Sequence, residues 1–162
     1  MFVSKLLLEF LPNVHLIGVF IVAFTVVYRY KALYPIYIFV FLVGLYNGFS
    51  IWWIPYLYLW AILWGAVMLL PKRMSVKTSV IVYALVCGLH GLCYGTLYAP
   101  AQALLFGYDL NMTLAWIAAG FPWDLIHGAS NLVGGLLIVP LITLIRKLER
   151  TNAKNASLNE PR

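Results

Sequence analysis

Long apolar stretches separated by short polar junctions form the dominant pattern of this chain. A helix needs roughly 20 apolar residues to cross a bilayer. Five stretches approach that length, at about residues 15–28, 32–50, 52–70, 78–98 and 123–145. They are rich in Leu, Val and Ile over a length that ordinary soluble helices do not reach. The pattern therefore predicts an all-α, polytopic integral membrane protein.

Two shorter apolar pieces accompany these spans, at residues 2–11 and 112–120. The first is only about half a span long. The second is followed by Phe121 and Pro122, and proline is favoured at the first position of a helix. We therefore expect Pro122 to open the last span. The piece before it is expected to lie in the membrane interface or to re-enter the bilayer.

Basic residues gather at alternate junctions and predict the orientation of the chain. They follow the first, third and fifth full spans: Arg29 and Lys31; Lys72, Arg73 and Lys77; and Arg146, Lys147, Arg150 and Lys154. The opposite junctions, at 12–14, 48–53 and 99–122, contain no Lys or Arg. The positive-inside rule places the basic side in the cytoplasm. We expect one transmembrane domain over residues 1–148 and a polar cytoplasmic tail over 149–162.

Composition excludes several function classes. The chain is 64% hydrophobic and 10% charged, with a mean hydropathy of +0.91, so a soluble globular domain is excluded. Its net charge of +6 comes from the clustered junctions and indicates topology, with no nucleic-acid partner expected. Cys87 and Cys93 lie six residues apart in one apolar stretch, where they point in different directions and cannot pair.

Polar residues of the apolar stretches gather at the end away from the basic junctions. Asp124, His127 and Asn131 are spaced i, i+3, i+7 and share one helix face. Because polar groups in lipid are costly and usually face a cavity or a partner, this placement predicts a substrate-binding site that opens to the outer side. The candidate residues are Glu9, Asn13, His15, Asn47, Trp53, Tyr56, His90, Tyr94, Gln102, Asp124, His127 and Asn131. His90, Tyr94 and Tyr98 form a second stripe, spaced i, i+4, i+8.

Structural interpretations of the same residues stay open. Aromatic residues are enriched at membrane interfaces, so an anchoring belt could explain Trp52, Trp53, Tyr56, Tyr58 and Trp60. A histidine within a span, such as His90, is often an interhelical hydrogen-bonding group. Gly91 and Gly95 form a small-xxx-small pair that favours close internal packing, or docking to another membrane subunit.

Several catalytic and metal motifs are missing from the chain. It contains no phosphate-cradling G-x-x-x-x-G-K-[ST] loop, no H-E-x-x-H motif, no Cys/His cluster with zinc spacing and no G-x-S-x-G elbow. We therefore expect neither ATP hydrolysis by the chain itself nor a bound cofactor. Metal binding by His15, His90, His127 and Asp124 stays an alternative. Two further alternatives are a small intramembrane enzyme that uses Asp124 and His127 as acid and base, and a structural or assembly protein.

Four runs of residues together resemble the substrate-binding S component of energy-coupling-factor (ECF) vitamin transporters. The runs are LPNVHL at 11–16, the stretch from YPIY to GLYNG at 34–48, WWIPYLY at 52–58 and GFPWDLIHG at 120–128. The resemblance covers about residues 4–148. It implies a bacterial six-helix plasma-membrane protein with both ends in the cytoplasm. Such a protein captures a vitamin or related micronutrient from outside and associates with a transmembrane T component and two cytoplasmic ATPases.

The start of the chain departs from this family. Members usually begin with a complete first span, whereas residues 1–6 resemble the middle of that helix. Either the start site is assigned too late, or this protein is a six-helix bundle with a shortened first helix. The aromatic residues favour a small, flat ligand, and Glu9 and Asp124 suit a cationic or hydrogen-bond-donating one. A thiamine-like or pyrimidine-like compound fits both features, with corrinoids and metal ions as alternatives.

Overall fold

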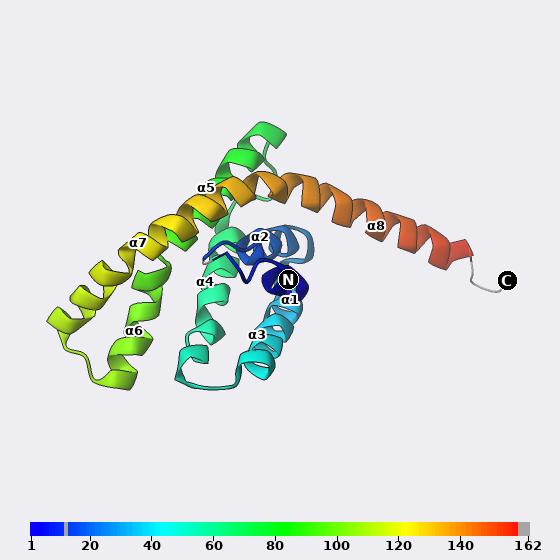
Figure 1. The fold of residues 1–162 in the computed structure, drawn as a ribbon. Coiled ribbons are helices and arrows are strands. Elements are labelled where there is room, and N and C mark those ends of the chain that lie inside the picture. The colour runs from blue at the N-terminus through cyan, green and yellow to red at the C-terminus, as the bar shows by residue number, and fades with distance from the viewer. Residues whose placement is uncertain (12, 159–162) are drawn as a thin grey trace.

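The computed structural model describes residues 1–11 and 13–158, and this part of the chain contains helices and no strand (Figure 1). The elements are short 3₁₀ helices (η) and α-helices, in chain order: α1 Phe2–Leu7, α2 Ile17–Tyr28, η1 Arg29–Ala32, α3 Leu33–Asn47, η2 Ile51–Trp53, α4 Tyr56–Leu69, α5 Val76–Leu92, α6 Tyr94–Phe106, α7 Leu110–Gly134, η3 Gly135–Leu137 and α8 Ile138–Leu158. The predicted all-α class is confirmed.

Four continuous helical stretches in the described chain are long and apolar enough to cross a membrane: Ile17–Asn47, Ile51–Leu69, Val76–Phe106 and Leu110–Asn155. Each joins neighbouring helices, or a helix and a 3₁₀ turn, into one run. Large apolar side chains are exposed on the outer faces of these stretches, and such surfaces are more stable in contact with lipid than with water. A multi-span membrane protein is therefore supported, whereas the predicted count of six helices is not.

The last span begins and ends differently from the prediction. Helix α7 runs without interruption through Pro122, so the expectation that Pro122 opens a new helix, after a re-entrant piece, was wrong. A proline removes one helical hydrogen bond, and a membrane helix tolerates this where its neighbours re-satisfy the freed backbone. The change of direction comes later, at η3, which joins α7 to α8 as one bent run (Figure 1).

Close packing of α7 against α5 and α6 depends on glycines. A Cβ atom on Gly91 would lie 2.7 Å from Asn131 Nδ2 and 2.9 Å from the carbonyl oxygen of His127. A Cβ atom on Gly95 would clash with the Asp124 carboxylate, at 2.5 Å from Oδ2. Small residues let membrane helices approach to backbone contact. The internal-packing interpretation of the Gly91/Gly95 pair is therefore confirmed.

Three basic residues lie together at one end of the bundle. Arg29, Lys72 and Arg146 come from three different junctions and line the same pocket. We call this region the basic end. From there α8 extends past the other helices (Figure 1). Residues 149–158 therefore continue the last helix, within the segment predicted as a polar tail.

Candidate functional site

Five aromatic side chains, each from a different part of the chain, meet inside the bundle, and we call them the ring cluster: His15, Trp60, His90, Tyr94 and His127. Trp60 lies at its centre and is 1% exposed. Its ring centroid is 5.8 Å from those of His90 and Tyr94 and 6.2 Å from that of His15. His127 closes the cluster, 4.7 Å from His15 and 4.9 Å from Tyr94.

Trp60 was not among the predicted site residues, and its burial disfavours the interface-belt role that the sequence left open for it. A belt residue has a polar edge in the headgroup region, whereas Trp60 is buried against Phe39 and Tyr56 as well as the cluster. Helical spacing could have revealed its burial, because Trp52, Tyr56 and Trp60 are spaced i, i+4, i+8 and share one helix face. The ring centroids of neighbouring members are 5.6 Å apart, so Tyr56 links Trp60 to the half-buried Trp52.

Polar atoms in and beside the ring cluster are left without protein partners. Within the described chain, the buried side-chain atoms that have no hydrogen-bond partner are His15 Nδ1, Trp60 Nε1, His90 Nδ1, His127 Nε2 and Asn131 Oδ1. Buried polar groups in native proteins almost always have partners. Four of these atoms belong to ring-cluster residues, and Asn131 lies one helical turn beyond His127. Such a concentration marks a place where a polar ligand could bind.

His90 shows which hydrogen-bonding roles remain. Its Nε2 atom lies 3.0 Å from the carbonyl oxygen of Leu59. A carbonyl only accepts, so in a neutral ring Nε2 carries the proton and Nδ1 is left as an acceptor. Trp60 Nε1, in contrast, is only a donor. The ring cluster therefore offers a ligand both a donor and an acceptor.

Asp124 has a structural partner that the sequence did not reveal. Both of its carboxylate oxygens lie 3.0 Å from the backbone N–H of Gly95, which donates to them from the first turn of α6. The first N–H groups of a helix have no partner within that helix, and a carboxylate is a favourable cap for them. Asp124 therefore caps α6 from the neighbouring helix α7, although it is part of the predicted polar stripe.

Replacing Asp124 by alanine is expected to lower the free energy of unfolding by about 0.5–2 kcal/mol, the usual cost of a lost cap. Asp124→Asn keeps one carbonyl oxygen for the Gly95 N–H and should lose much less. Denaturant-induced unfolding in detergent, followed by circular dichroism, measures both variants. An Asp124→Ala protein as stable as the wild type would rule out the capping role.

Asn131 has one partnered and one free polar atom. Its Nδ2 atom donates to the carbonyl oxygen of Cys87 at 3.3 Å, and the side chain is fully buried. This bond joins α7 to α5, so the amide has a packing role. Its Oδ1 atom stays available to a ligand.

Other predicted site residues lie outside the ring cluster. Glu9 is exposed and pairs with Lys5 one turn earlier, at 3.5 Å. Asn47 is exposed and bonds within its own helix to the Val43 carbonyl oxygen, at 3.4 Å. Trp53 donates from Nε1 to the carbonyl oxygen of Val40 at 2.8 Å, which fastens the turn before α4 to α3.

Two further candidates are half-buried. Gln102 lies on α6, and Asn13 precedes α2 with a φ of 58°. That value lies in the left-handed region, which asparagine tolerates better than most residues. Asn13 thus turns the chain just before His15 joins the cluster.

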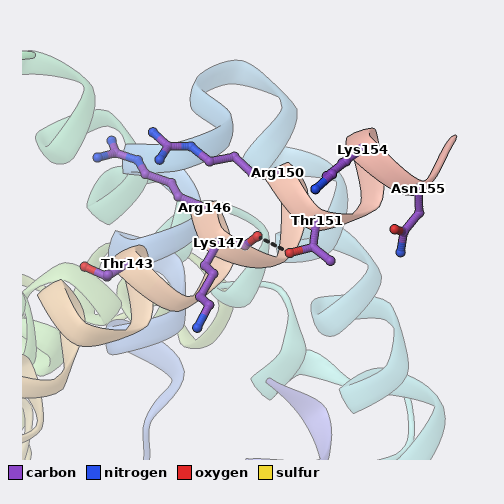
Figure 2. Close-up of a pocket in the computed structure, with 7 residues that line it drawn as sticks. All are labelled: Thr143, Arg146, Lys147, Arg150, Thr151, Lys154 and Asn155. Carbon is purple, nitrogen blue, oxygen red and sulfur yellow. Dashed lines mark hydrogen bonds between the residues drawn. The ribbon is translucent and has the colours of Figure 1, made fainter. Parts of the chain in front are cut away.

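A pocket of about 570 Å³ adjoins the ring cluster through His15. It lies between residues 14–16 and one face of α7, where Ile126, Ser130 and Gly134 are among its lining residues. This pocket is an open groove with an almost wholly apolar lining, so the polar atoms of the candidate site come from the ring cluster. A separate pocket of about 720 Å³ lies on the projecting part of α8, among basic residues and away from the rings (Figure 2).

The described residues contain no group of three or more His, Cys, Asp or Glu side chains arranged to hold a metal ion. Although three histidines meet in the ring cluster, they do so by ring packing. Asp124, the acidic residue of the predicted polar stripe, is directed to the Gly95 N–H.

Comparisons with known proteins give no relative for this chain. Neither a protein-family model, nor a curated protein, nor a solved structure matches it. The resemblance to ECF S components therefore stays a prediction that rests on the residues themselves.

Proposed function

We propose that this protein captures a small, polar, heteroaromatic nutrient in the ring cluster, as the substrate-binding S subunit of an ECF-type importer. The observation that carries the proposal is the group of unpartnered buried polar atoms around Trp60. Leaving such atoms without a partner costs free energy comparable to a lost hydrogen bond. A ligand that bonds to several of them would recover that free energy.

The chemistry of the cluster selects the class of ligand. Aromatic walls favour a flat ring, through stacked or edge-to-face contacts. The donor on Trp60 and the acceptor on His90 favour a ligand that has both kinds of group, as a pyrimidine has. Asp124 no longer argues for a cationic ligand, because its carboxylate is engaged by the Gly95 N–H.

Ligand binding requires some rings to separate. Their centroids are 4.7–6.2 Å apart, so the rings contact one another directly. His15 is the member that can move most easily, because it lies in the non-helical segment before α2. Its displacement would join the cluster to the 570 Å³ pocket on its other side. No helix needs to unfold for this movement.

The partners follow from what the chain lacks as well as from the resemblance. Uptake by an ECF importer uses ATP, and this sequence has no phosphate-binding loop of its own. A transmembrane T component and two cytoplasmic ATPases would supply it. In this proposal the chain lies in a bacterial plasma membrane with its basic end and its C-terminus in the cytoplasm, in accord with the positive-inside rule.

Two other functions remain as competitors. An intramembrane enzyme needs a free base, and the capping role of Asp124 disfavours the Asp124/His127 pair in that function. A structural protein would use the ring cluster only for packing. Both alternative functions can be distinguished from ligand capture by measurement. An enzyme turns its substrate over without partners, and a structural protein binds no small molecule.

Native mass spectrometry of the detergent-purified protein tests the proposal. The expected result is one small molecule bound per chain, either co-purified or added from a vitamin panel. An empty protein that ignores the panel would contradict ligand capture. Identification of the released compound names the substrate.

Replacing His127 by phenylalanine is expected to weaken binding of that compound about tenfold, the effect of losing roughly 1.4 kcal/mol. The substitution keeps a ring in contact with His15 and Tyr94 but removes the free nitrogen atom. Asn47→Ala is the control, because Asn47 is exposed and bonds only within its helix. Isothermal titration in detergent compares the affinities. Equal affinities of the His127→Phe protein and the wild type would remove His127 from the site.

A further inference from the structure

The basic end contains a small pocket whose chemistry is unlike that of the ring cluster. It has a volume of about 150 Å³ and is lined by Val26, Arg29, Val67, Leu70, Pro71, Lys72, Tyr83 and Arg146. Three of these eight residues are cations and none is acidic. They come from distant parts of the sequence, so the fold itself brings the charges together.

Arg29 is held firmly at the wall of this pocket. One nitrogen atom of its guanidinium group, Nη2, donates to the carbonyl oxygen of Met68 at 3.0 Å. Its own carbonyl oxygen accepts a hydrogen bond from Trp64 Nε1 at 3.1 Å. Arg29 also has a φ of 53°, an unusual backbone conformation for a side-chain-bearing residue. These bonds fix the position of the guanidinium group, and a guanidinium group has several other N–H donors.

Lys72 and Arg146 complete the cationic wall from two other elements. Lys72 lies in the loop between α4 and α5, and Arg146 lies on α8. Figure 2 shows Arg146 extending to a different side of α8 from Lys147. The acidic residue of the same helix, Glu149, lies beside Tyr28 and is not among the lining residues. The positive charges around the pocket therefore have no carboxylate among them.

We infer that this pocket binds a phosphate group. Three cations around one small space repel one another, and an anion between them relieves that repulsion. Arginine and lysine bind phosphate through charge-assisted hydrogen bonds, and arginine can do so with two parallel N–H donors. Tyr83 also lines the pocket, and a tyrosine hydroxyl group can donate a hydrogen bond to phosphate.

Two sources present this chemistry at a membrane protein. One is the phosphodiester of an anionic lipid headgroup, since basic pockets between helices near the cytoplasmic surface bind such groups. The other is a free phosphate compound in solution. The apolar residues of the wall, Val26, Val67 and Leu70, can contact the glycerol and first methylene groups of a lipid. This site is independent of the ring cluster and of the proposed nutrient.

Lipid binding is tested on the full-length protein by native mass spectrometry with phosphatidylglycerol and phosphatidylcholine. The wild type is expected to retain phosphatidylglycerol preferentially. Lys72→Gln/Arg146→Gln should weaken this retention about tenfold or more, because two charge-assisted bonds are lost. The matched control is Arg73→Gln/Lys147→Gln, which removes the same charges from the neighbouring residues. Both pairs are exposed, so folding should not change.

The free-phosphate source is tested by thermal unfolding in inorganic phosphate and in chloride at equal ionic strength. Stabilisation by phosphate that disappears in Lys72→Gln/Arg146→Gln, but not in the control pair, identifies free phosphate as a ligand. Retention of the lipid without this stabilisation identifies the headgroup. The inference is overturned if both double variants weaken binding equally, or if the wild type binds neither probe.

Discussion

Trp60→Ala is expected to remove ligand binding and to lower the free energy of unfolding by about 3–5 kcal/mol, the range measured for large aromatic side chains in cores. Trp60 is 1% exposed and contacts rings from four other parts of the chain, those of His15, Phe39, His90 and Tyr94. Its loss leaves a cavity that rigid helices cannot fill. The same change at Trp123, which is 53% exposed on α7, is the control and should cost little. Unfolding in detergent and native mass spectrometry measure the two effects.

Trp60→Phe separates packing from ligand binding. Phenylalanine keeps an aromatic ring near His90 and Tyr94 but lacks the indole N–H, which has no partner in the protein. If that N–H donates to a ligand, the variant should keep most of its stability and lose about tenfold in affinity, or roughly 1.4 kcal/mol. If the indole N–H makes no bond to the ligand, Trp60→Phe will bind the ligand with the affinity of the wild type. That result would remove Trp60 Nε1 from the proposed contacts.

Periodicity predicted which residues share a helix face, and these predictions agree with the structure. Asp124, His127 and Asn131 are all buried, and so is His90. Their common burial follows from helical spacing and from the cost of exposing polar groups to lipid. Apolar length alone was enough to predict an all-helical membrane protein.

The sequence did not predict which groups form hydrogen bonds between helices. Spacing places Asp124 on a face but does not say that a backbone N–H, that of Gly95, lies opposite. An interface belt was also a reasonable interpretation of Trp60, because tryptophan is generally enriched at membrane interfaces. Its burial depends on how α4 crosses the segment of His15 and helix α5, which is a property of the tertiary structure.

Pro122 shows the limit of a local rule. Proline favours a helix start, but it is also tolerated within membrane helices. Which of the two occurs depends on whether the helix before it can stay in register with its neighbours. Helix α7 stays packed along α5 and α6 on both sides of Pro122. The chain changes direction later, at η3, where Gly135 lies against the backbone of α5.

Gly135→Ala is expected to lower the free energy of unfolding by about 1–3 kcal/mol, as overpacking of a tight interior does. A Cβ atom on Gly135 would lie 2.6 Å from the Cα atom of Ala84 and 2.8 Å from its Cβ atom. The obstacle is the backbone of α5, which no side-chain rotation can relieve. The helices must separate at η3, where α7 turns into α8 and the chain passes from the ring cluster towards the basic end.

Gly65→Ala and Gly120→Ala are the matched controls for this change. Both glycines lie within helices, and a Cβ atom on either would meet nothing within 4 Å. Because alanine loses less conformational freedom than glycine on folding, these variants should be more stable than the wild type by about 0.4–1 kcal/mol. If denaturant unfolding shows that Gly→Ala lowers the free energy of unfolding at position 135 and raises it at 65 and 120, the loss at 135 comes from the contact with Ala84. A Gly135→Ala protein stabilised like the controls would show that η3 and α5 are not in backbone contact at Ala84.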